Sequence, residues 1–63
     1  MGAKRVTQLL QFIAVRAPEA QDAIGNGDNT ICYELLSMIE IDSAEARKEM
    51  ESLLESDKGS HMP

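Results

Sequence analysis

Residues 25–29 read Gly-Asn-Gly-Asp-Asn, and this stretch decides how the chain can fold. Glycine and asparagine favour turns because they tolerate backbone conformations that most other residues avoid. This is the one clear loop signal in the 63 residues. We therefore expect a loop here, with helix-forming segments on both sides of it.

The segment before the loop has the apolar spacing of a helix. From about Lys4 to Arg16, one face collects apolar residues three and four positions apart. They are Val6, Leu9, Leu10 and Ile13. Because Pro18 disfavours helical backbone at the residue before it, we expect this helix to end near Arg16. A short second helix then begins at Pro18 and is capped by Gly25. Its expected core residues are Ala20, Ala23 and Ile24.

The segment after the loop is also helical and can begin after any of three capping residues, Asp28, Asn29 or Thr30. Its apolar stripe comprises Ile31, Cys32, Leu35, Met38 and Ile39. Asp42 and Glu45 fit a capping box, which favours a break and a separate last helix. The apolar face of that helix comprises Ala46, Met50, Leu53 and Leu54. Since no Gly or Pro stands at the junction, one helix over about 30–57 is the alternative, although Asp42 and Glu49 would interrupt a heptad seam.

The fold class is therefore all-α, in a single helical domain over residues 1–58. We expect a small bundle of three to four short helices, and the alternative is a two-helix hairpin with one long helix over 30–57. Residues 59–63 are typical of a cloning-derived or disordered tail, which leaves no histidine for a site. Because so short a chain buries little of its surface alone, we expect it to be dimeric.

The charge distribution restricts the class of partner. The formal net charge is -5, and every acidic residue lies at Glu19 or later. An acidic body repels nucleic-acid phosphates, so we expect no direct nucleic-acid partner. One cysteine excludes an internal disulfide, and no stretch is apolar enough for a membrane span. These features predict a cytoplasmic protein with no membrane partner.

The residue types for catalysis are missing. Cys32 has no histidine to activate it, and it lies on an apolar stripe where a buried small residue is the usual meaning. The stretch from Asp22 to Glu34 resembles a calcium loop but places its oxygen ligands at the wrong positions. We therefore expect no enzyme activity, no catalytic or cofactor-binding residues, no cofactor and no metal site.

Three side chains are the candidate protein contacts. Phe12 and Val15 lie off the main stripe of the first helix, so they belong either to a core on two sides or to a face for another chain. Tyr33 lies on the polar side of its helix, either as an incidental half-exposed ring or as an amphipathic contact.

The predicted function is a non-enzymatic helical docking module with Phe12, Val15 and Tyr33 at its interface. Its partners are a second copy of the chain, in a homodimer, and a second protein. The alternative is an acidic inhibitor or antitoxin-like regulator that binds a basic surface on a partner protein.

Overall fold

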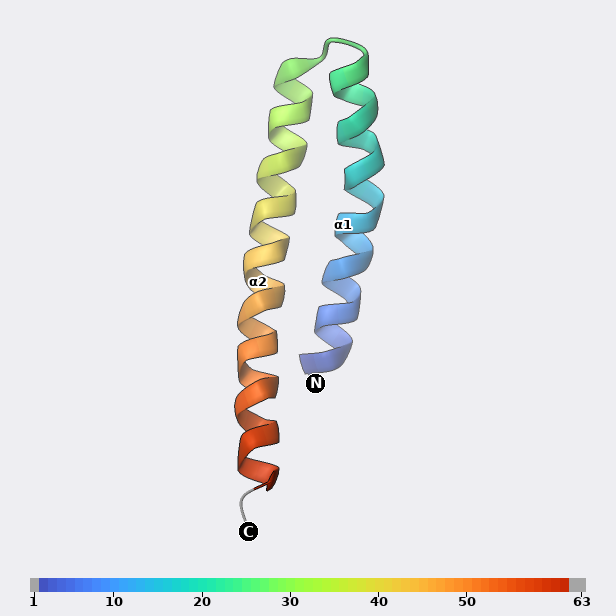
Figure 1. Cartoon of the computed structure of the whole chain (residues 1–63). Coiled ribbons are helices and arrows are strands. Elements are labelled where there is room, and N and C mark those ends of the chain that lie inside the picture. Colours follow the sequence, from blue (N-terminus) through green and yellow to red (C-terminus); the bar gives the residue numbers. More distant parts are fainter. Residues whose placement is uncertain (1, 62–63) are drawn as a thin grey trace.

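The computed structural model describes residues 2–61, and their side chains from residue 2 to residue 56. Two antiparallel helices form a hairpin: α1 spans Gly2–Gly25 and α2 spans Asn29–His61 (Figure 1). The C-terminal end of α2 extends beyond the start of α1 (Figure 1). The predicted all-α class is confirmed. The prediction of three to four short helices is wrong, and the alternative hairpin with one long second helix is the observed architecture.

The connection between the helices is a Schellman turn centred on Gly27. The amide of Asp28 donates to the carbonyl of Ala23 over 2.8 Å, and the amide of Gly27 donates to the carbonyl of Ile24 over 3.2 Å. This pair of bonds requires a left-handed residue, and Gly27 has a φ of 82°. α1 ends at Gly25, as the predicted cap there implied, but the left-handed capping residue is Gly27, two residues later than predicted.

Pro18 lies inside α1 and does not end it. Proline removes one backbone amide, so the carbonyl four residues earlier, at Ala14, has no helical donor. Pro18 and Ala14 are both exposed, so water can hydrate that carbonyl. The predicted end of the helix near Arg16 and the separate short helix are wrong because residues on both sides of Pro18 pack against α2.

The predicted break at Asp42 is also absent, since α2 is continuous from Asn29. The carboxylate of Asp42 accepts a hydrogen bond from the guanidinium of Arg16 on α1, instead of capping a helix. The start of α2 agrees with the prediction, because the carbonyl of Asp28 accepts the first helical bond, from Cys32, over 3.0 Å. Of the predicted tail at 59–63, the backbone of α2 is described to His61, and Met62 and Pro63 lie outside the described residues.

The two helices meet along a heptad seam. Along α1, the residues that are not fully exposed alternate in steps of four and three, as positions d and a of a seven-residue repeat do. They are Gly2, Val6, Leu9, Ile13, Arg16, Ala20 and Ala23. The same alternation in α2 includes Cys32, Leu35, Ile39, Asp42, Ala46, Glu49 and Leu53, and Ser37 is partly buried as well but lies off this alternation. A seven-residue repeat of this kind was not predicted, because Asp42 and Glu49 were expected to exclude it.

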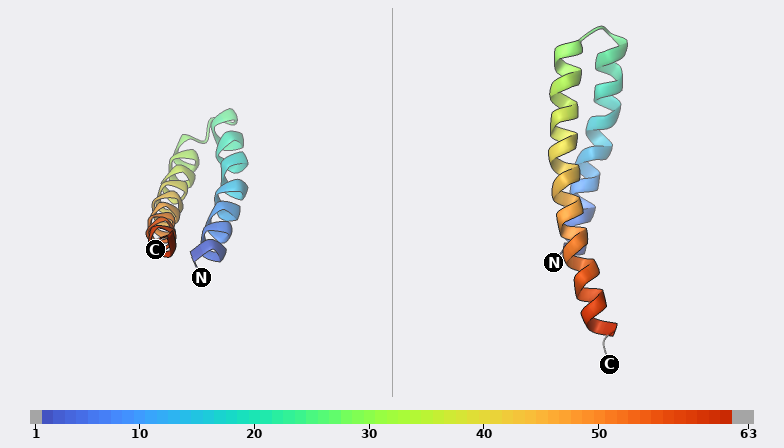
Figure 2. Two further views of the ribbon diagram at one scale, coloured as in Figure 1. Left: turned by 60° about the horizontal axis from the view of Figure 1, so that its bottom comes forward. Right: turned by 60° about the vertical axis from the view of Figure 1, so that its left-hand side comes forward.

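Very little of the chain is buried by this seam. Among the residues whose side chains are described, four form the core, namely Leu9, Ala20, Ala23 and Ala46. The molecule measures 56 × 14 × 14 Å with a radius of gyration of 15.5 Å, whereas a compact domain of this length has about 11 Å. In the two views of Figure 2, no third segment of the described chain covers either side of the helix pair. The hairpin is thus one layer of helices without a second layer.

The two glycines of the turn should respond in opposite directions to the same substitution. Gly27→Ala forces a side chain into the left-handed region and should lower the free energy of unfolding by ~1–2 kcal/mol. Gly25 is helical and has no atom within 4 Å of an added Cβ, so Gly25→Ala should raise it by up to ~1 kcal/mol. Urea titrations followed by circular dichroism measure both changes. Equal effects at the two positions would contradict the assignment of Gly27 as the cap.

Candidate functional site

The three predicted interface residues are all exposed, but they do not form one surface. Phe12, Val15 and Tyr33 are 41%, 63% and 70% exposed. Phe12 and Val15 lie on the same side of α1, near its middle. Tyr33 lies one turn into α2, close to the connection, and on the opposite side of the helix pair by helical geometry. The structure brings the first two together and separates the third from them.

The seam divides the surface of the hairpin into two flanks. In an antiparallel pair of helices, the g positions of both lie on one side of the seam and the e positions of both lie on the other. An ion pair between the guanidinium of Arg5 and the carboxylate of Glu45 joins two g positions and confirms this arrangement. Every remaining exposed side chain can therefore be placed on one flank or on the outer surface.

The first flank, which we name the neutral flank, contains the e positions of residues 2–56, the part of the chain whose side chains are described, and none of these residues is charged. From α1 it presents Ala3, Leu10, Ala17 and Ile24, and from α2 it presents Leu36, Ser43 and Met50. All of these residues are exposed. Leu10, Ile24 and Met50 were predicted to face the core. The seam repeats every 3.5 residues, whereas a straight helix repeats every 3.6 residues. When the 3.5-residue repeat is applied to the same sequence, these three residues fall beside the seam and not on it.

The second flank, which we name the charged flank, contains the g positions and the adjacent c positions. Its acidic side chains are Glu19, Asp22, Glu34, Glu45 and Glu55, and its basic ones are Arg5 and Lys48. Exposed apolar side chains lie among them, namely Phe12, Val15, Ile31, Met38 and Ile41. This flank combines negative charge with apolar area, unlike the neutral flank.

A polar pair occupies the middle of the seam. Arg16 and Asp42 stand at core positions of their helices and form an ion pair, with side chains 30% and 16% exposed. The guanidinium of Arg16 also lies 5.6 Å from the centre of the Phe12 ring, within the range of a cation–π contact. The pair fixes one register of the two helices along their axes, because sliding either helix by one heptad would leave a half-buried charge without its partner.

A third polar residue of the seam, Glu49, lies at the end of the hairpin. Gly2 allows the start of α1 to approach α2 closely, since an added Cβ would lie 3.2 Å from Cγ of Leu53 and 3.3 Å from Oε1 of Glu49. The Glu49 carboxylate therefore sits beside the N-terminal end of α1. That end carries partial positive charge, so the acid is stabilising there.

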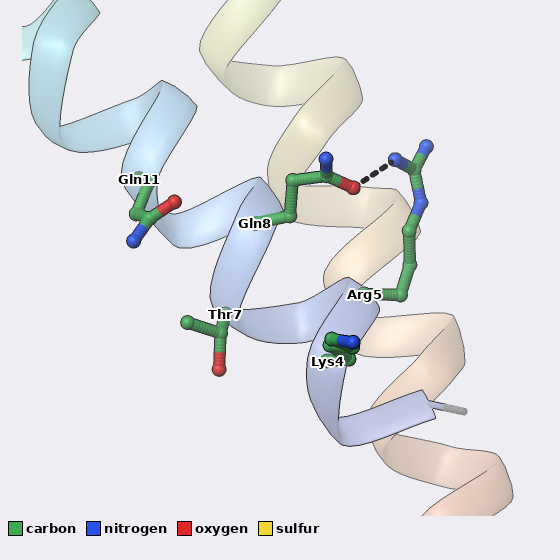
Figure 3. Close-up of a pocket in the computed structure, with 5 residues that line it drawn as sticks. All are labelled: Lys4, Arg5, Thr7, Gln8 and Gln11. Carbon is green, nitrogen blue, oxygen red and sulfur yellow. Dashed lines mark hydrogen bonds between the residues drawn. The ribbon is translucent and has the colours of Figure 1, made fainter.

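Cys32, the potential metal ligands and a surface hollow are the places in the described chain where a reactive site could lie. Cys32 is a free, half-buried cysteine of the seam. No three potential ligand side chains converge among the described residues. The shallow hollow in Figure 3 is lined by Lys4, Arg5, Thr7, Gln8 and Gln11. All five come from the first turns of α1 alone, so the hollow is an open surface between side chains of one helix.

The half-buried pair should matter more to stability than the exposed one. Asp42→Ala leaves Arg16 without its partner on the seam and should lower the free energy of unfolding by ~1–3 kcal/mol. Glu45→Ala breaks the exposed pair with Arg5 and should cost no more than ~1 kcal/mol. Replacing both seam partners by leucine should recover most of the loss, because an apolar pair needs no partner charge. Urea denaturation at equal protein concentration measures all three variants. A Glu45 effect as large as that of Asp42 would contradict the seam assignment.

The two flanks are the features of the described chain on which a proposed function can rest. Within the described residues, neither helix has the length and apolar content needed to cross a membrane. Searches against protein-family models, curated proteins and solved structures found no match to this chain.

Proposed function

We propose that the chain is a non-enzymatic helical module that acts by associating with other protein chains, first of all with a second copy of itself. The single observation that carries this proposal is the imbalance between core and surface. Within residues 2–56, four residues are buried, whereas eleven large apolar side chains are exposed. An isolated two-helix hairpin gains too little from burial to offset the loss of chain entropy, so association supplies the missing core.

The accessible area supports the same proposal. The chain exposes 5097 Å². A compact monomer of its 6.9 kDa exposes about 4,000 Å², which leaves an excess of about 1,100 Å². The overhanging end of α2 contributes part of this excess, and the two flanks contribute the rest. A standard interface buries about 800 Å² on each partner, so the excess is of the size that a stable complex covers.

The charged flank favours a second candidate function, that of an acidic regulator which binds a basic surface on another protein. Phe12 and Val15 lie among its carboxylates, and this mixture suits a basic amphipathic partner helix. Such a partner would be held by ion pairs as well as by apolar contacts. This candidate is compatible with self-association, because it uses the other side of the hairpin.

The mass in solution tests the proposed association. We expect sedimentation equilibrium to give at least twice the 6.9 kDa of one chain at micromolar concentration. We also expect the melting temperature to rise with protein concentration, because association is linked to folding. A monomer at all concentrations, with a concentration-independent melting temperature, would refute self-association.

Ionic strength distinguishes the two candidate modes of binding. Each chain carries a net charge of -5, so two copies repel each other and added salt should strengthen the self-complex. Binding of a basic partner through carboxylates should weaken with salt. Self-association that weakens steeply between 50 mM and 500 mM sodium chloride would show that ion pairs, not apolar contacts, hold the complex.

A further inference from the structure

We infer that the neutral flank is the surface on which a second copy of the chain docks, and that the product is a two-fold symmetric four-helix bundle with the two loops at opposite ends. This inference rests on the proposed function and assigns it a surface, a partner and a geometry.

The chemistry of the neutral flank is that of an interface core. Leu10, Ile24, Leu36 and Met50 are between 40% and 56% exposed, and they alternate with the small residues Ala17 and Ser43. Next to this row, the border of the flank on α1 is uncharged as well, since it consists of Thr7, Ala14 and Gln21. Large and small side chains in alternation allow two such surfaces to interdigitate.

The pattern along α2 matches itself under a two-fold rotation. In a symmetric interface, residues at equal distances before and after the axis meet each other across it. About an axis close to Ser43, Leu36 meets Met50, and Tyr33 meets Leu54. Among the described side chains, the charged residues that border the flank are Glu40 and Arg47, and they meet as an opposite pair. Within residues 29–56, an antiparallel α2–α2 contact thus has no unmatched charge.

The pattern along α1 obeys the same axis. A two-fold axis that passes α1 between residues 13 and 14 brings Leu10 against Ala17 and Ala3 against Ile24. Each large side chain then meets a small one. The points at which the axis passes α1 and α2 also lie at the same height along the hairpin. The ion pair between Arg16 and Asp42 and the contact of Gly2 with Leu53 place the middle of α1 beside residues 42–45 of α2. One rotation axis therefore serves both helices.

The charged flank does not offer this self-match. In a symmetric contact through that flank, each copy would contribute five acidic and two basic side chains, and this excess of like charge is repulsive. The occupant of the neutral flank is a second copy, because this flank is complementary to itself under a two-fold rotation. A surface that binds an unrelated partner does not need to be complementary to itself.

Two substitutions of similar exposure on α2 test the choice of flank. Leu36 is 53% exposed on the neutral flank and Ile41 is 64% exposed on the charged flank. Leu36→Glu buries a charge in both halves of the dimer and should raise the dissociation constant at least ~100-fold. Ile41→Glu should change it less than ~3-fold. Sedimentation measures the constants, and circular dichroism checks that both variants remain helical.

Cross-linking tests the symmetry axis independently of stability. In a Cys32→Ala background, Ser43→Cys places two thiols beside each other at the axis, and it should give a covalent dimer under mild oxidation. Ala44→Cys, one residue further, faces the outer surface and should remain monomeric on a non-reducing gel. The double charge reversal Glu40→Arg with Arg47→Glu should dimerise at least ~10-fold more tightly than Glu40→Arg alone.

The outcomes separate the two proposals. A dimer that Leu36→Glu weakens, with Ser43→Cys cross-linking selectively, supports the inference. A dimer that Ile41→Glu dissociates and Leu36→Glu does not would overturn the choice of flank and leave the proposed association intact. Preferred cross-linking through Ala44→Cys would overturn the axis. A wild-type chain that is monomeric at all concentrations would overturn both proposals.

Discussion

Two helices in contact share a single seam, and a single seam can cover only two of every seven side chains on each helix. The incomplete core and the exposed apolar side chains of this chain follow from that limit. The seam itself is well formed, with a strict alternation of three and four residues from Gly2 to Ala23 and from Cys32 to Leu53. What it cannot do is enclose the apolar side chains on its own two sides. The hairpin therefore has a regular backbone and an incomplete core.

The residues of the seam favour close approach over apolar volume. Ala20, Ala23 and Ala46 are three of its four buried residues, and they leave room for the backbones to approach each other. Arg16 and Asp42 add a polar pair in the middle. A polar pair at a core position contributes little net stability but penalises other alignments of the helices. The alignment has a consequence beyond the hairpin, since it determines which residues of α1 and α2 lie level with each other on each flank.

The sequence predicts the helical class and the position of the connection, but it does not predict which helix breaks are real. Pro18 and the Asp42–Glu45 box are genuine local signals for helix ends. Both are overridden by packing across the seam, and the Arg16–Asp42 pair that does so joins residues 26 positions apart. No local pattern reveals such a contact.

The predicted core was too wide rather than misplaced. Val6, Leu9 and Ile13 are on the seam as expected, whereas Leu10 in the same stripe is exposed. Ile24, Ile31, Met38, Met50 and Leu54 differ from the prediction in the same way. A stripe wider than one seam is what a helix with more than one neighbour requires. In the proposed dimer the residues on or beside the neutral flank regain the predicted burial, whereas Ile31 and Met38, on the charged flank, stay exposed.

The two flanks then divide the surface between different kinds of contact. Carboxylates on the charged flank make a symmetric contact there unfavourable, and in the proposed dimer this directs self-association to the neutral flank without any need for specific attraction. The same carboxylates surround Phe12 and Val15, so these side chains stay accessible in the bundle. A basic partner could reach them on both outer sides of the dimer at once, and two equivalent sites on one rigid body bind a divalent partner more tightly than either site alone. Dimerisation would in that case control affinity for the partner, because a monomer offers only one site.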